Sequence, residues 1–384
     1  MDVKQIYEIV NQISGEVLGT TDLLKEDLSN IVDLGTEIFS KRQLDNYVKA
    51  LTDRIGRVVF VNRKYNGKFP TVLRSGWEYG SILQKINGGL YDAKENQSWE
   101  LEDGQSYDDH IFYKPKASQK FYNIKTTFEI RVSFTEMQVK ESFTSPTELN
   151  AFISMIYNDI EKSMTVKFES LVLRLINNFI GETVYDEYQG ASVKTSSGVK
   201  AINLLYLYNQ EKGTSLTADK CLTDKDFLRF ASSEISLRMK QMSGITTLFN
   251  IGEQPRFTPR ELMHVVLLSS FTSKVSSYLE SDTFHKELVA LPNYEDVPFW
   301  QGTGLKYSFD DVSSIDIMTA SGQNIQLSGI LGVIFDHDAL GMNNYDRRVR
   351  TSITDSAEFT TNYYKFDCQY FNDTNENFIV FFVA

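Results

Sequence analysis

Residues 145–181 read SPTELNAFISMIYNDIEKSMTVKFESLVLRLINNFIG, and this stretch decides the fold of the chain. Ser145, Pro146 and Glu148 form a capping box with proline at the first helical position, which predicts a helix start. Apolar residues then recur in steps of three or four, as expected for a helix with one buried face. These residues are Leu149, Ile153, Ile156, Ile160, Met164, Phe168, Leu171, Leu175 and Phe179. Gly181 is expected to end the helix, because glycine readily takes the left-handed conformation of a C-terminal cap.

The expected helix, residues 146–180, would be roughly 50 Å long at 1.5 Å per residue. Such a spine needs a broad apolar surface along its length. Residues 126–134 alternate between apolar and polar side chains, which predicts a strand, and the tail ends in the apolar run 378–383. We therefore expect the spine to lie against a sheet built from both segments. The alternation changes parity after Phe134, which predicts a β-bulge near Thr135.

Composition limits the class of protein. The chain has 384 residues, 41% of them hydrophobic, which excludes disorder and leaves room for two or three domains. Its net charge of -12 argues against a protein that binds duplex nucleic acid, because such binding needs a basic face. No apolar run is long enough for a membrane span, and the first residues lack a signal peptide, so we expect a soluble protein made in a cytoplasm. Cys221 and Cys368 fit no metal spacing and are expected to be reduced.

The region before the spine cannot build a core by itself. Two helices are expected at residues 5–13 and 36–55, and β-rich segments at 57–61 and 77–86. The polar stretch 87–118 follows. Ordering about thirty residues of this region costs on the order of 30–60 kcal/mol in backbone entropy, so we expect it to lie on a neighbouring subunit. The residues predicted to make that contact are Trp77, Tyr79, Trp99, Phe112, Tyr113, Lys114 and Lys116.

The region after the spine mixes helices and strands. Residues 201–208 predict a strand or a short helix, 223–242 and 272–288 predict helices, and strands are expected within 263–268, 314–318 and 329–335. The tail 358–384 is β-rich. The alternation is too irregular for a doubly wound sheet, so the fold class is α+β.

No stretch reads as a catalytic, cofactor-binding or metal site. Asp336, His337 and Asp338 form the most suggestive cluster, but neighbouring side chains on a strand point to opposite faces, and a polar turn after a strand explains them better. The sequence contains no Walker loop and no Gly-x-Ser-x-Gly elbow. We expect no enzyme and no cofactor.

The order of elements resembles the major capsid proteins of tailed bacteriophages, which share the Hong Kong 97-type fold. Four stretches carry the resemblance. Residues 57–68, RVVFVNRKYNGK, resemble the start of the extended loop (E-loop), within which Asp103-Gly104-Gln105-Ser106 and Lys114-Pro115-Lys116 follow. Residues 172–182, VLRLINNFIGE, resemble the end of the spine helix, and residues 332–341, GVIFDHDALG, resemble a strand and turn near the C-terminus.

The resemblance implies a domain plan. It comprises an N-terminal arm (1–56), the E-loop (57–124), a P-domain with the spine (125–200), an A-domain (201–344) and a C-terminal β return to the P-domain (345–384). It also implies pentamers and hexamers that tile an icosahedral shell around double-stranded DNA, without sequence-specific binding. The expected partners are a separate scaffolding protein and a portal protein, and the expected location is the virion after assembly in the host bacterial cytoplasm. No trio of residues stands out for covalent cross-linking.

Three alternatives stay open at this point. An encapsulin-type compartment would share the fold and differ in its cargo. A metal-dependent enzyme would use Asp336, His337 and Asp338. A third alternative is another virion component, such as a tail or decoration protein.

Overall fold

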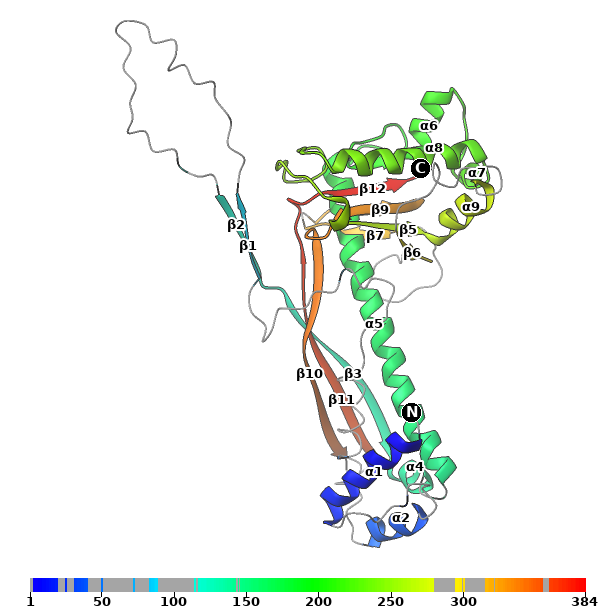
Figure 1. The fold of residues 1–384 in the computed structure, drawn as a ribbon, viewed down its shortest axis with the longest axis vertical. Coiled ribbons are helices and arrows are strands. Elements are labelled where there is room, and N and C mark those ends of the chain that lie inside the picture. The colour runs from blue at the N-terminus through cyan, green and yellow to red at the C-terminus, as the bar shows by residue number, and fades with distance from the viewer. Residues whose placement is uncertain are drawn as a thin grey trace, which may run out of the picture.

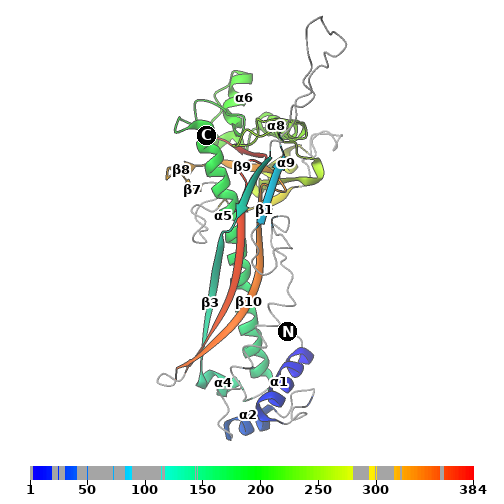
Figure 2. The same ribbon diagram turned by 90° about the vertical axis from the view of Figure 1, so that its left-hand side faces the viewer.

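The computed structural model describes residues 3–19, 25, 31–40, 50, 72, 83–88, 114, 117–142, 144, 146–279, 294–298, 300, 315–320, 322–354 and 359–384. One long helix, α5 (Pro146–Tyr188), runs through the molecule from a small helical foot to an upper sheet (Figure 1). The foot holds α1 (Val3–Leu18), α2 (Ile31–Ser40) and α4 (Glu136–Ser142). A second, three-stranded sheet lies alongside the helix between these ends (Figure 2).

The spine helix is longer than the sequence pattern predicts. It has 43 residues, hence a length of about 65 Å. The predicted stop at Gly181 is wrong: this glycine lies inside the helix, where a Cβ would come 3.1 Å from Ile317 Cγ2. Gly181 therefore allows a close approach to strand β7 (Ile315–Met318), and the left-handed residues that end the helix are Gln189 (φ 46°) and Gly190 (φ 87°).

The lower sheet is antiparallel with strand order β10-β11-β3. Its strands are β3 (Lys125–Thr135), β10 (Leu340–Thr354) and β11 (Phe359–Asn372). Side chains of β11 alternate between buried and half-buried, so one face of the sheet packs on α5. The ring of Phe366 lies 5.2 Å from that of Phe168 on α5 and 5.5 Å from that of Phe128 on β3.

The expected bulge near Thr135 is absent, because helix α4 begins there. The backbone N–H of Thr135 donates to Gln138 Oε1 at 3.1 Å, and the N–H of Gln138 donates back to Thr135 Oγ1 at 3.3 Å. This reciprocal pair is a capping box. The change of parity after Phe134 therefore marks the change from strand to helix.

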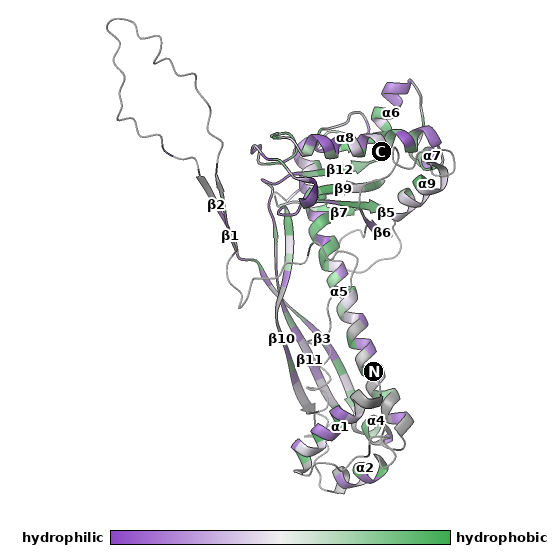
Figure 3. Cartoon of the chain, in the orientation of Figure 1, coloured by the Kyte–Doolittle hydropathy of each residue, from purple (hydrophilic) through white to green (hydrophobic). Residues whose placement is uncertain are grey.

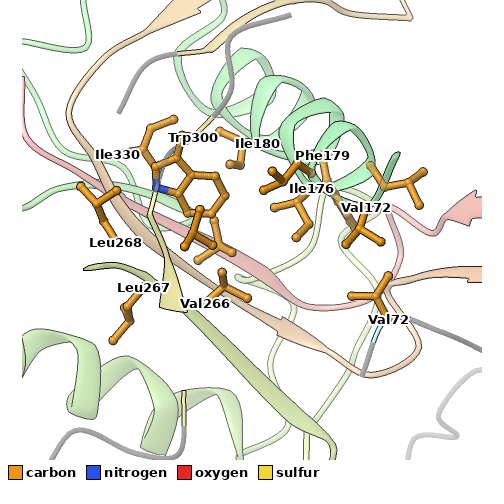
Figure 4. Close-up of a cluster of buried hydrophobic side chains, with 14 of the residues drawn as sticks. Val72, Val172, Ile176, Phe179, Ile180, Val266, Leu267, Leu268, Trp300 and Ile330 are labelled. Atoms are coloured by element: carbon orange, nitrogen blue, oxygen red, sulfur yellow. The ribbon is translucent and has the colours of Figure 1, made fainter. Parts of the chain in front are cut away.

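The upper sheet has the order β4-β12-β9-β5-β6. Its strands are β4 (Ala201–Asn203), β5 (Met263–Leu268), β6 (Glu295–Val297), β9 (Ile330–Asp336) and β12 (Phe378–Phe382). Every residue of β9 and β12 is buried, and Figure 3 shows hydrophobic residues concentrated in the upper sheet. Phe179 of α5 stacks on Phe378 with ring centroids 4.1 Å apart. Figure 4 shows this end of α5 facing Val266 and Trp300.

The spine thus packs against two sheets, which corrects the expectation of one. Strands β3 and β12 belong to different sheets, although β11 and β12 follow each other in the chain. The short connection 373–377 between them lets the chain pass from the lower sheet to the upper one. Two separate apolar surfaces explain how so long a helix is buried.

The remaining elements refine the predicted boundaries. Residues 201–208 form β4 and then α6 (Leu204–Lys212), and α8 (Lys225–Met242) begins after the N-cap Asp224. Helix α9 (Ser269–Leu279) starts before the predicted position, and residues 280–288 lie outside the described part. The other short elements are α7 (Ala218–Cys221), η4 (Arg260–Leu262) and β8 (Asn324–Leu327), which pairs with β7. Among the described helices, none is long and apolar enough to cross a membrane.

A candidate assembly arm and its ionic anchor

A two-stranded hairpin stands out from the side of the body (Figure 1). It pairs β1 (Leu83–Gly88) with β2 (Ala117–Tyr122) in antiparallel register, so that Lys85 faces Lys120 and Gln84 faces Phe121. Because partners across a ladder share a face, the two lysines lie on one face and Phe121 on the other. Phe121 is 62% exposed, and Ile86, on the same face, is 66% exposed. One face of the hairpin therefore carries the two lysines, and the other exposes Phe121 and Ile86 opposite Gln84 and Gln119.

The charged face is bound to the turn between β11 and β12. Lys85 Nζ lies 2.9 Å from Asp373 Oδ2 and 2.7 Å from Glu376 Oε1, and Lys120 Nζ lies 2.9 Å from Asp373 Oδ1. The side chain of Asp373 is fully buried. We call these four residues the ionic anchor. Arg256 Nε adds a contact of 3.4 Å to Glu376.

The turn that carries the two carboxylates is rigidly built. The backbone N–H of Asp373 donates to the carbonyl of Ala339 at 2.7 Å, and the N–H of Asn375 donates to Asp373 Oδ1 at 3.1 Å. The N–H of Glu376 donates to the Asp373 carbonyl at 3.1 Å. The carboxylates are thus held in place before the lysines reach them, which lowers the entropy cost of the ion pairs.

The two carboxylates differ in acidity. Burial alone would raise the pKa of Asp373, but its hydrogen bond and charge interaction with Lys85, together with Lys120, hold that pKa below its usual value. Burial dominates at Glu376 and raises its pKa, and Lys85 and Arg256 offset that rise only in part. Burial and then the charge of Asp373 raise the pKa of Tyr122, whose ring lies 5.1 Å from that of Phe371. Asp373 therefore stays negatively charged down to a lower pH than Glu376 does.

The residues predicted to make subunit contacts fall almost entirely outside the described part. Trp77, Tyr79, Trp99, Phe112, Tyr113 and Lys116 are in this position. Lys114 is described and is exposed, and its contact with a neighbouring subunit stays a prediction. Sequence reasoning missed the ionic anchor, because Asp373 and Glu376 look like ordinary polar residues of a turn.

Asp336, His337 and Asp338 do not converge on a common point. The Asp336 carboxylate accepts hydrogen bonds from Thr258 Oγ1 at 2.7 Å and from the N–H of Asp338 at 2.8 Å. His337 Nδ1 lies 2.9 Å from His264 Nε2 on the neighbouring strand β5. Within the described ranges, no group of three or more His, Cys, Asp or Glu side chains is placed to hold a metal ion. Asp336 thus ties strand β9 to the loop before β5.

The long helix beside an antiparallel sheet, the buried upper sheet and the hairpin at the side define a capsid subunit of the Hong Kong 97-type fold. A capsid structure of Staphylococcus phage Andhra superposes with a TM-score of 0.51 over 84% of this chain and 86% of that one, at 10% identity. A structure of bacteriophage P68, titled for its head fiber and inner core protein, gives 0.53 over 85% and 86%, at 8% identity.

The family is shown by a second comparison. The family model of the Phi29-like phage major capsid protein matches residues 6–382, so the chain belongs to that family. No curated protein matches the chain. The chain is therefore a phage major capsid protein, a structural component of the shell. The encapsulin and metal-enzyme alternatives are not favoured.

Proposed function

We propose that this chain assembles into pentamers and hexamers of an icosahedral shell that encloses double-stranded DNA, and that its hairpin is the arm that reaches a neighbouring subunit. The observation that carries the proposal is the two-faced hairpin. Its charged face is bound to its own subunit, while Phe121 and Ile86 on the other face are exposed. Apolar side chains in this position favour contact with another protein surface.

The domain plan inferred from the sequence fits this function. The arm at 57–124 would lie across a neighbour, and the spine region at 125–200 and the return at 345–384 would form the wall. The region 201–344 would meet other subunits at the capsomer centre, with strand β12 of the return paired between its strands β4 and β9. Trp77, Tyr79, Trp99, Phe112, Tyr113, Lys114 and Lys116 remain our candidates for contact residues on the arm. Aromatic residues are enriched in such interfaces.

The partners follow from the same function. A separate scaffolding protein would guide assembly in the host bacterial cytoplasm, and a portal protein would occupy one vertex. The net charge of -12 supports a lining that encloses DNA without adhering to it.

Electron microscopy of the purified protein, expressed with and without a scaffolding protein, tests the proposal. We expect closed polyhedral particles. A protein that stays monomeric at high concentration under both conditions would refute the proposed assembly. Particles that contain a cargo enzyme and no DNA when recovered from infected cells would favour a compartment shell.

A further inference from the structure

A rigid loop with exposed apolar side chains lies beside the ionic anchor. It connects α8 to β5 and includes residues 243–258. The backbone groups of Thr246 and Arg256 exchange two hydrogen bonds of 2.9 Å, which closes the loop as an antiparallel bridge. Ile245 directly precedes Thr246 and Phe257 directly follows Arg256, so these two side chains flank the bridge. Ile245 is 63% exposed and Phe257 is 55% exposed.

Leu248 adds a third exposed apolar side chain, at 58%. We call Ile245, Leu248 and Phe257 the loop patch. Isolated apolar residues are common on protein surfaces. Three on one loop, two of them flanking the bridge, form a feature that the intrachain packing does not use.

The loop is held firmly from its inner side. Phe249 is 2% exposed, and its carbonyl accepts a hydrogen bond of 2.8 Å from the N–H of Phe378 on β12. The N–H of Gly252 donates to the carbonyl of Thr374 at 3.0 Å, and Thr258 Oγ1 donates to Asp336 at 2.7 Å. The loop patch is therefore preorganised, and a partner would bind it without paying to order the loop.

The loop that carries the loop patch and the arm both contact the same turn, residues 373–376. Thr374 holds the loop, Asp373 holds the arm, and Glu376 contacts both Arg256 of the loop and Lys85 of the arm. The arm therefore leaves its own subunit beside the loop patch, and a neighbouring subunit that packs against the base of the arm would also lie near the loop patch. This step rests on the proposed function.

The charge of the loop also favours a copy of this chain as the partner. The whole chain carries a net charge of -12, so two copies repel each other on average. Residues 243–258 contain one acidic residue, Glu253, and one basic residue, Arg256, so their net charge is 1 − 1 = 0. Arg256 is already paired with Glu376. Because Arg256 is paired outside the loop, Glu253 is the charge that the loop retains, and the loop patch is a place of low charge density where two negative subunits can meet with little repulsion.

We propose that the loop patch is an interaction surface for a second copy of this chain, and that it acts together with the arm at the same junction. Three side chains alone do not reach the area of a stable interface, which is about 1,000 Å² or more in total. The loop patch therefore strengthens the contact that the arm begins. Its chemistry, apolar and neutral at a preformed loop, suits an apolar surface on the neighbouring copy.

Substitution of the loop patch tests the proposal. The variant carries Ile245→Ser, Leu248→Ser and Phe257→Ser, and Met318→Ser is the matched control because Met318 is 73% exposed on β7, away from the loop. Thermal unfolding of the monomer checks that each variant folds like the wild type. Sedimentation velocity over a concentration series, and particle yield by microscopy, measure assembly.

We expect the triple variant to fold normally but to need a concentration at least about tenfold higher for association, the effect of losing one strong interface contact. The control variant should assemble like the wild type. A photoreactive phenylalanine analogue at position 257 should cross-link two copies in assembled particles. If the wild type and the triple variant assemble equally well, the inference is wrong while the shell function stands. If the wild type does not associate at all, both are wrong.

Discussion

Replacing Asp373 by asparagine tests whether the ionic anchor holds the arm. The change keeps the shape of the side chain and removes one buried negative charge, which faces Lys85 and Lys120 at 2.9 Å each. Hydrogen bonds between charged groups contribute about 1.5–3 kcal/mol each. The lysine side chains are 18% and 35% exposed and can turn toward water, which limits the loss. We expect docking of the hairpin to weaken by about 2 kcal/mol, hence by about 30-fold.

Hydrogen–deuterium exchange measures this docking directly. We expect the amides of residues 83–88 and 117–122 to exchange up to about 30-fold faster in Asp373→Asn, while the upper sheet keeps its protection. The matched control is Asp367→Asn, because Asp367 pairs with Arg348 on the lower sheet, away from the hairpin. Exchange of the hairpin in Asp373→Asn that equals that of the wild type would refute the role of the anchor.

The other predictions concern acidity, the spine and one turn. Glu376→Gln should flatten the pH dependence of the free energy of unfolding. Because the pKa of Glu376 is raised in the folded state, this residue stabilises the wild-type fold below the ordinary pKa of 4.5, and that stabilisation is lost as pH rises through the folded pKa; Asp373, with a lowered pKa, loses its contribution only as pH falls below 3.8. Urea unfolding of both proteins across pH 3–7 measures the difference, and parallel curves would contradict the prediction. Ile160→Asp should lower the free energy of unfolding by about 4 kcal/mol or more, because Ile160 is fully buried. Asn158→Asp, on the exposed side of the same helix, should be nearly neutral. Thermal unfolding compares the two variants, and a folded, assembly-competent Ile160→Asp protein would disprove the buried position. Gly329→Ala should destabilise the fold by more than about 2 kcal/mol, because φ of Gly329 is +73° and a Cβ would lie 2.1 Å from the Val383 carbonyl oxygen. Gly213→Ala is the control: its φ is +63°, but the space around it is open, so it should cost about 1 kcal/mol. Equal melting temperatures of the two variants would show that the steric argument fails.

Helices and strands that depend on residues close together in the sequence were predicted well. The start of the spine, the strand at 126–134 and the strand at 263–268 follow from capping chemistry and from the two-residue period. The end of the spine did not follow, because Gly181 serves a contact with Ile317 far along the chain rather than a cap. The grouping of β3 and β12 into different sheets is also set by long-range pairing, which periodicity does not encode.

The ionic anchor was beyond the reach of sequence reasoning for the same reason. Lys120 and Asp373 are 253 residues apart in the chain, and neither belongs to a motif. The loop patch was equally hidden, since Ile245, Leu248 and Phe257 read as ordinary core residues in a mixed α/β region. Only their exposure in the structure shows that these side chains face outward. By contrast, the polar turn predicted after the strand at 329–335 is confirmed, because strand β9 ends at Asp336 and residues 337–339 form a turn.

The length of the spine has a mechanical consequence. Helix α5 is a single stiff rod of about 65 Å, gripped by the foot at one end and by the upper sheet at the other. A rotation of about 5° at the foot moves the far end by about 6 Å, the lever effect of a rod of this length. Small angular differences between neighbouring subunits therefore become large displacements at the upper sheet. If the chain forms the pentamers and hexamers proposed above, this geometry lets one sequence fit both flat and curved regions of the shell.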